Sequence, residues 1–218
     1  MPRMSPDDRR AAIVAATRAV MGSRGIGGTT VRDVAAELGA SSGLIHHYYA
    51  SMDDLLAETF EEVATEDLEE MRAALAAAEG AVDQLVVFFD VYARDDDSGI
   101  QVWLDAWAEA ARRPALQRIS RRLNEEWQAL LSGILRRGVA DGKLVCADPD
   151  AVAWRILSLL DGLALQVVAH GDVISIHEAD AWARAGAERE VGLPEGSLTR
   201  GEPRAGTSSP MRVVPRIP

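Results

Sequence analysis

The sequence predicts an all-α protein with two parts, a small N-terminal domain of three helices and a larger helical body. Apolar residues recur every three or four positions through most of the chain, which is the spacing of one face of a helix. Capping residues precede these segments, and glycines follow several of them. The stretch 144–148 (LVCAD) is too short and too isolated to indicate a β-sheet.

The first helix is predicted to run from Ser5 to Gly22. Ser5 suits the N-cap, Pro6 suits the first helical position, and the two aspartates that follow suit the positive end of the helix dipole. The glycine-rich segment 23–29 is expected to form a loop.

Residues 30–49 carry the pattern of two short helices joined by a tight turn. Thr30 and the aspartate three residues later fit a capping box, and Gly39 suits the left-handed turn that ends a helix. Ser41 or Ser42 can cap the second helix. This order is typical of a helix-turn-helix, whose second helix enters the DNA major groove, although an ordinary helical hairpin shares it.

Six further helices are predicted after this motif. A second capping box begins a helix at Ser51 that runs for roughly seven turns to about Ala78, long enough to connect the N-terminal domain to the body. The other five are predicted at residues 82–92, 100–111, 116–138, 150–170 and 176–191.

Composition changes after these helices and sets the predicted domain boundaries. Residues 192–218 are rich in Gly, Pro, Ser and Arg, which predicts a disordered tail. The chain is therefore divided into a DNA-binding domain at 1–51, a helical effector-binding and dimerisation domain at 52–191, and this tail. Three consecutive aspartates in the loop 93–99 do not match the spacing of a calcium loop, so no metal site and no cofactor are predicted.

Length, composition and cysteine content favour a protein of the cytoplasm. The 218 residues are 48% hydrophobic and 26% charged. Cys146 is the single cysteine, so no intramolecular disulfide can form and a reducing compartment is favoured. The N-terminus lacks the apolar core of a signal peptide. Arg155 and Asp161 interrupt the apolar run 151–169, which indicates a buried helix and no membrane span.

Charge is distributed unevenly along the chain. Residues 1–51 hold six arginines and four acidic residues, a net charge of +2, whereas the whole chain carries −11, so the remainder carries −13. A mildly basic N-terminal domain can bind phosphate locally while the acidic body repels it.

Several N-terminal residues carry a family resemblance through their order and spacing: Ile13, Ala16, Gly25, Thr30, Val34, Ala35, Gly39, Gly43, Ile45, Tyr48, Tyr49, Ser51, Asp54, Leu55 and Leu56. With this set the chain resembles the TetR family of transcriptional regulators. The segments 43–49, 102–110 and 159–166 are similar to the BetI-type branch of that family, whose namesake responds to choline.

The resemblance implies that the second helix of the helix-turn-helix reads a double-stranded DNA operator. Ile45 and Tyr49 would pack inward. Leu44 can contact a thymine methyl, and the histidines can donate to bases or phosphates. The implied DNA-contacting residues are Thr30, Arg32, Ser42, Gly43, Leu44, His46, His47 and Tyr48.

One position departs from the family pattern. The residue after Ser51, usually a lysine that reaches a phosphate, is Met52 here. Its loss should remove one phosphate contact and lower the salt dependence of DNA binding by about one unit of slope.

The last two predicted helices favour a homodimer. Helix 150–170 is apolar on almost all sides, so it needs cover on more than one face. Helix 176–191 carries small residues beside Trp182, which allow close helix packing. Together they suggest a self-complementary four-helix interface, although a large monomeric core would use the same residues.

Aromatic and acidic residues of the body suggest an effector site for a small molecule of cationic or aromatic character. Aromatic faces with a buried carboxylate would suit an organic cation, although core packing alone explains any single tryptophan. Asp105 and Glu109 also lie near these stripes. The predicted pocket residues are Phe89, Tyr92, Trp103, Trp107, Trp127 and Asp161.

These patterns predict a repressor that leaves a palindromic operator when a small molecule binds the body. No nucleophile motif, phosphate loop or His/Cys metal spacing supports an enzyme. The alternative is a helical dimer that acts as a protein-interaction scaffold without ligand control.

Overall fold

The computed structural model describes residues 5–92, 97–171 and 173–199. These residues form nine α-helices and no β-strand, which confirms the predicted all-α fold. The helices are α1 (Pro6–Gly28), α2 (Val31–Glu37), α3 (Ser42–Tyr48), α4 (Met52–Ala76), α5 (Gly80–Tyr92), α6 (Asp97–Ala110), α7 (Pro114–Ala140), α8 (Pro149–Ala169) and α9 (Ile176–Glu190).

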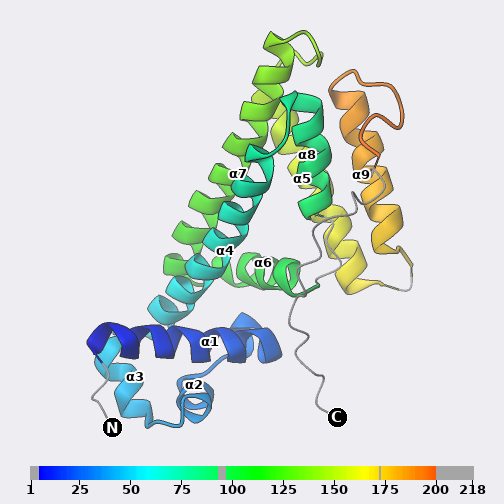
Figure 1. Cartoon of the computed structure of the whole chain (residues 1–218). Coiled ribbons are helices and arrows are strands. Elements are labelled where there is room, and N and C mark those ends of the chain that lie inside the picture. Colours follow the sequence, from blue (N-terminus) through cyan, green and yellow to red (C-terminus); the bar gives the residue numbers. More distant parts are fainter. Residues whose placement is uncertain (1–4, 93–96, 172, 200–218) are drawn as a thin grey trace.

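The molecule has a small head, residues 5–51, and a larger body, residues 52–199. In the head, α2 and α3 lie beneath α1 (Figure 1). Helix α4 leads from the head into the body and packs along α7, while α6 lies crosswise between α1 and the rest of the body (Figure 1). Helix α8 packs against α7 and α9, and α9 lies at the side of the body away from the head (Figure 1).

Three hydrophobic clusters form a core that continues from the head into the body. One lies inside the head, where Ile13, Val34 and Ile45 join α1, α2 and α3. A second includes residues of α1, α4, α6 and α7, and therefore joins the two parts. The third fills the body between α4, α5, α7, α8 and α9. Because the middle cluster contains residues from both parts, the position of the head depends on the packing of α4 and α6.

The end of α1 differs from the prediction. The helix does not end at Gly22 but continues to a kink at Gly25, whose φ of 72° lies in the left-handed region, and helical structure resumes to Gly28. The predicted loop 23–29 was therefore wrong in most of its length. The reason is tertiary: Ile26 is fully buried in the middle cluster, where it packs among residues of α4 and α6.

The start of the predicted tail is also folded. Residues 192–199 pack against the body, and Leu198 is 0% exposed in the body cluster. The Glu188 carboxylate accepts hydrogen bonds from the backbone N–H groups of Gly196 and Leu198, at 3.1 and 2.7 Å. The Arg184 guanidinium donates to the Leu198 carbonyl oxygen at 2.6 Å. Disorder was therefore wrong for 192–199, and residues 200–218 lie outside the described residues.

Candidate DNA-binding surface and effector site

The helix-turn-helix is built by capping interactions within a few residues. The Thr30 hydroxyl oxygen accepts the Asp33 backbone N–H, and the Asp33 carboxylate accepts the Thr30 backbone N–H, both at 3.3 Å. Gly39 has a φ of 64° in the turn after α2. Ser41 is the N-cap of α3, although its side chain makes no capping hydrogen bond. These short-range interactions place α3 beside α2 and leave one of its faces open.

Helix α3 has one buried and one exposed face. Ile45 and Tyr49 are 2% and 4% exposed, which confirms that they pack inward. Gly43, His46 and His47 are exposed. The other three predicted contact residues of this helix, Ser42, Leu44 and Tyr48, are half-buried. An exposed pair of histidines beside a glycine leaves room for close approach to a DNA groove.

The two predicted contacts before α3 differ in how free their side chains are. Thr30 and Arg32 are both exposed. The Thr30 hydroxyl donates to Asp33 at 2.6 Å, so its proton is used within the capping box. The Arg32 side chain forms no hydrogen bond or ion pair among the described residues, so its guanidinium is available for a phosphate. The Thr30 hydroxyl therefore serves as a cap, and Arg32 is the better candidate of the two for a phosphate contact.

The beginning of α4 is attached to the head by buried and charged groups. The Tyr49 hydroxyl donates to the Glu58 carboxylate at 2.9 Å, and the Arg10 guanidinium binds the same carboxylate through Nε at 2.8 Å. Hydrogen bonding to Arg10 lowers the pKa of Glu58 from its usual value. Met52 is half-buried and packs against both the head cluster and the middle cluster. Its thioether therefore contributes to the core at the place where the family usually has a lysine.

Helix α6 touches the end of α1 at two glycines. A Cβ atom at Gly25 would lie 2.8 Å from Asp105 Oδ2, and one at Gly27 would lie 3.0 Å from Glu109 Oε1. Asp105 and Glu109 therefore lie against the head and not beside the aromatic residues of the predicted pocket, because their helix face is turned toward α1. Closeness in sequence to the aromatic residues of α6 therefore does not bring these two carboxylates to the predicted pocket.

An ion-pair chain continues from α6 to the first turn of α4. Glu109 accepts a hydrogen bond from Arg113 Nε at 2.9 Å, and the same guanidinium pairs with Asp53. All three side chains are at least partly shielded from solvent. These ion pairs thus connect the end of α6, the start of α7 and the start of α4, which follows directly after the helix-turn-helix.

Aromatic residues from two helices meet a half-buried carboxylate in the body. The Phe88 ring stacks on Tyr92 with centroids 6.3 Å apart and meets Trp127 edge-on at 6.1 Å. The Tyr92 hydroxyl donates to the Asp161 carboxylate on α8. The buried Trp127 Nε1 has no hydrogen-bond partner among the described residues. This arrangement joins three aromatic rings, one carboxylate and one unused N–H donor.

Burial determines the protonation of this group. It raises the pKa of Asp161 to about 6, although the hydrogen bond from Tyr92 partly opposes the shift. Burial and the neighbouring carboxylate raise the pKa of Tyr92 well above its usual value. Asp161 can therefore carry a negative charge at neutral pH in an apolar setting, where an organic cation would compensate for it.

The other predicted pocket residues lie around this group in different settings. Phe89 is fully buried beneath the Arg184 guanidinium, whose carbon lies 5.4 Å from the ring centroid. Trp103 and Trp107 of α6 have ring centroids 5.7 Å apart in the middle cluster, and Trp127 packs against both clusters. The structure thus gathers Tyr92, Trp127 and Asp161. Phe88, which lies one helical turn before Tyr92, belongs to the same group.

The outward face of the α8–α9 pair carries uncovered apolar side chains. Trp154, Leu159 and Leu165 of α8 are 40%, 37% and 46% exposed, and Trp182 of α9 is 49% exposed. The opposite face of α8 belongs to the body cluster. Among the described helices, α8 is also long and apolar enough to cross a membrane by length and composition alone. In one chain α8 is therefore covered on one face and not all round.

Comparison with known proteins matches both parts of the chain. The family profile described as bacterial regulatory proteins of the tetR family matches residues 13–59, and the BetI-type transcriptional repressor C-terminal profile matches residues 79–192. The HTH-type transcriptional regulator BetI of Vibrio vulnificus is 30% identical over 189 residues, covering 82% of this chain and 91% of that protein. The protein of the same name from Agrobacterium fabrum is 30% identical over 176 residues, covering 76% and 80%.

Solved structures share the fold. A transcriptional regulator from Pseudomonas aeruginosa is 29% identical with a TM-score of 0.74, covering 86% of this chain and 92% of its own. A transcriptional regulator from Saccharomonospora viridis, determined in complex with choline, is 23% identical with a TM-score of 0.78, covering 85% and 98%. The similarity therefore extends across the head and the body.

Proposed function

We propose that this chain, which belongs to the TetR family of transcriptional regulators and has a BetI-type C-terminal domain, is a dimeric repressor that a small organic cation releases from its operator. The family consists of DNA-binding proteins that are not enzymes. The observation that carries the proposal is the exposed face of α3, where Gly43, His46 and His47 stand free beside half-buried Leu44. We place the protein in the cytoplasm, where an operator is accessible.

Direct reading of DNA would be carried out by α3 with support from the start of α2. The histidines would donate hydrogen bonds to base edges or phosphates, and Leu44 would contact a thymine methyl. Arg32 would bind a phosphate on one side of the groove, with Thr30, Ser42 and Tyr48 as further contacts. Two heads related by a two-fold axis would read a palindromic operator in successive major grooves.

The uncovered apolar face of α8 and α9 supports the dimer. Two copies of Trp154, Leu165 and Trp182 would bury each other in a four-helix interface with two-fold symmetry. Gly162 lies on the same side of α8, and a Cβ there would meet no atom within 4 Å, which leaves space for the partner helix. This arrangement would also remove from water the apolar face that a single chain exposes.

The aromatic group around Asp161 supports a cationic effector. A quaternary ammonium or a similar small cation would gain from the faces of Phe88, Tyr92 and Trp127 and from the charge of Asp161. The unused Trp127 Nε1–H would donate to a hydroxyl or carboxylate on the effector. Since relatives of 30% identity are named BetI and one similar structure was determined with choline, choline is the first compound to test.

Effector binding would reach the head through α4 and α6. Both helices contribute to the cluster that joins the body to α1, and α6 touches Gly25 and Gly27 with Asp105 and Glu109. A shift of these helices would change the separation of the two heads, so they would no longer fit two successive major grooves. This is a two-state switch in which the effector favours the state that does not bind DNA.

A gel-shift assay on the DNA that flanks the gene for this chain tests the proposal. We expect a shift at low salt that disappears when choline or a related cation is added. A thermal-shift screen of small cations, anions and neutral aromatics would identify the effector class independently. Absence of a shift at low salt would rule out the regulator, and a complex that keeps its operator affinity and head separation with a bound effector would rule out the switch.

A further inference from the structure

The arginines of the head divide into two groups according to their partners. Arg10 pairs with Glu58, Arg18 pairs with Glu66 at 2.7 Å, and Arg24 pairs with Asp33 at 3.0 Å. Arg9 and Arg32 have no hydrogen-bond or ion-pair partner among the described residues. Arg32 belongs to the proposed DNA surface, so Arg9 is the remaining cation of the described head that has no assigned role.

The place of Arg9 on α1 is unfavourable for helix stability. It lies near the N-terminal end of the helix, where the dipole and the free N–H groups favour anions and disfavour cations. A nearby carboxylate offsets this effect for Arg10, whereas Arg9 has no such partner among the residues that the structure describes. The stability of α1 therefore does not explain an arginine at this position.

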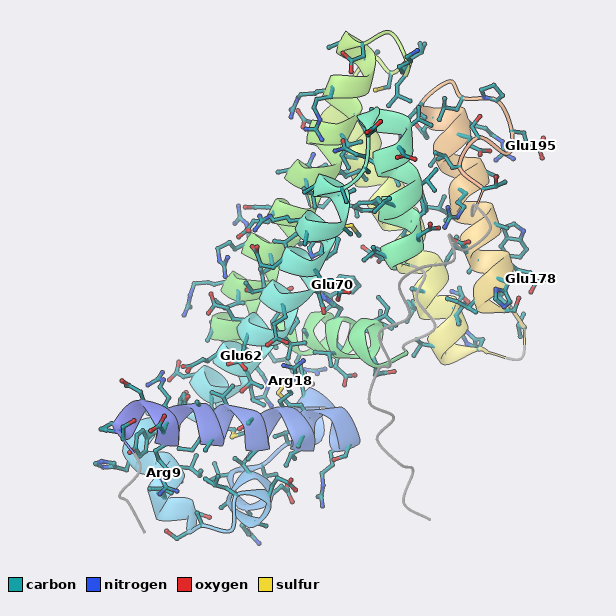
Figure 2. All side chains as sticks on the ribbon, viewed as in Figure 1. Arg9, Arg18, Glu62, Glu70, Glu178 and Glu195 are labelled. Carbon is teal, nitrogen blue, oxygen red and sulfur yellow. The ribbon has the colours of Figure 1, made fainter. Side chains whose placement is uncertain are left out.

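Helix geometry places Arg9 on the side of α1 that carries α3. It precedes Ile13 by one helical turn, and Ile13 is fully buried between α1, α2 and α3. Figure 2 shows Arg9 beside α3, whereas Arg18 lies on the opposite side of α1, toward the body. Arg9 thus stands at the edge of the surface that presents His46 and His47.

We infer that Arg9 binds a DNA phosphate at the edge of the groove that α3 enters, an inference that rests on the proposed DNA-binding function. With Arg32 at the start of α2, it supplies cations on two sides of α3. Arg9 lies four residues before the span 13–59 that matches the tetR-family profile. Arg9 would supply a contact with the DNA phosphate backbone. The usual lysine after Ser51 is replaced in this head by Met52, which packs into the core.

The salt dependence of DNA binding tests this contact in the full-length dimer. Each phosphate contact adds about 0.9 to the slope of log affinity against log salt concentration, so Arg9→Gln should lower that slope by about 1.8 for two protomers. The affinity should fall roughly tenfold at 50 mM salt, and the difference should almost vanish by 200 mM. The loss should be equal on a 40-base-pair duplex from upstream of the gene and on a scrambled duplex, since phosphates carry no sequence.

Arg18→Gln is the matched control because it removes the same charge from the same helix on the side that faces the body. Its salt slope should stay that of the wild type, and Arg9→Lys should retain most of the slope. Arg9 has no partner among the described residues and opposes the helix dipole, so Arg9→Gln should not lower the melting temperature. If the wild type binds DNA but Arg9→Gln and Arg18→Gln have equal slopes of log affinity against log salt concentration, the Arg9 contact is overturned and the DNA-binding function is not. A wild type that binds neither duplex would overturn the DNA-binding function with it.

Discussion

The head and the body of this chain obtain their functional surfaces from interactions of different range. In the head, the capping box of Thr30 and Asp33 and the turn at Gly39 fix α3 through contacts within a few residues. In the body, the proposed effector site joins Tyr92 to Asp161, which are 69 residues apart in the sequence. The proposed DNA-reading surface is therefore set locally, whereas the proposed effector site exists only while several helices keep their packing, and it can change when that packing shifts.

The exposed surfaces of the head and the body also differ, in this case in polarity. The head presents polar and cationic groups on one side of α3, while the body presents the apolar face of α8 and α9. A polar surface suits a partner that must be released, and an apolar one suits a lasting interface between two copies. In the proposed function the head therefore binds its partner reversibly, and the body forms the lasting contact between two copies.

The largest expected effect comes from separating the two bodies. Leu165→Glu places a charge in the proposed interface and should convert the dimer into a monomer, as measured by analytical ultracentrifugation. Operator affinity should then fall by roughly 10²–10⁴, since one head loses the gain from the linked second head. Val145→Glu is the control, because Val145 is 74% exposed in the loop between α7 and α8. A Leu165→Glu dimer of normal affinity would contradict the assignment.

The second expected effect concerns Asp161 in the body, whose substitution should change the free energy of unfolding and the affinity for a cation in opposite directions. Because burial raises the pKa of Asp161 to about 6, the folded protein gains stability from this group as pH falls below 6 and loses it as pH rises through 6. Asp161→Asn should remove this loss and raise the free energy of unfolding at pH 8 by up to roughly 3 kcal/mol. The same variant should weaken cation binding, because the carboxylate charge is gone. Urea unfolding at pH 5 and 8 and calorimetry with choline measure the two effects.

Asp67→Asn is the matched control for that experiment. Burial also raises the pKa of Asp67, and Trp103 Nε1 donates to its carboxylate at 3.2 Å. It should gain stability at high pH as Asp161→Asn does, yet leave the affinity for the cation unchanged. If both variants lose cation affinity equally, the effector does not bind at Asp161 in particular.

A third effect is confined to the head. His47→Ala should weaken operator binding by about 1–3 kcal/mol per site while the dimer and the melting temperature stay unchanged, because the side chain is exposed on α3. His177→Ala removes an equally exposed histidine from α9 and should have no effect on DNA binding. Loss of affinity for the operator but not for a scrambled duplex would identify His47 as a base contact, and unchanged affinity for both would exclude it.

The range of the interactions also explains what the sequence could predict. The caps at Ser5, Thr30 and Ser51 were predicted and are present, because each depends on residues three positions away. The inward packing of Ile45 and Tyr49 follows from helical periodicity and is confirmed.

The incorrect predictions involve contacts between distant segments. Asp105 and Glu109 share a helix with Trp103, but only tertiary packing decides that their face meets α1. The folding of residues 192–199 depends on Arg184 and Glu188, which are 5% and 3% exposed. The available signal was that they directly follow Ala183 and Ala187, two of the small buried residues of α9, since buried charges require partners.

The smallest expected effect compares two capping boxes, one in each part. Thr30→Ala should lower the free energy of unfolding by about 1 kcal/mol, and Ser175→Ala should do the same at the start of α9, where Ser175 and Glu178 form the same box. Amide hydrogen exchange should show reduced protection in α2 alone for the first variant and in α9 alone for the second. Operator affinity should fall only for Thr30→Ala, because only α2 orients the reading helix, and Thr30→Ser should restore it. Loss of protection in α9 upon Thr30→Ala would instead mean that the head and the body unfold as one unit. The head would then not owe its stability to local interactions alone.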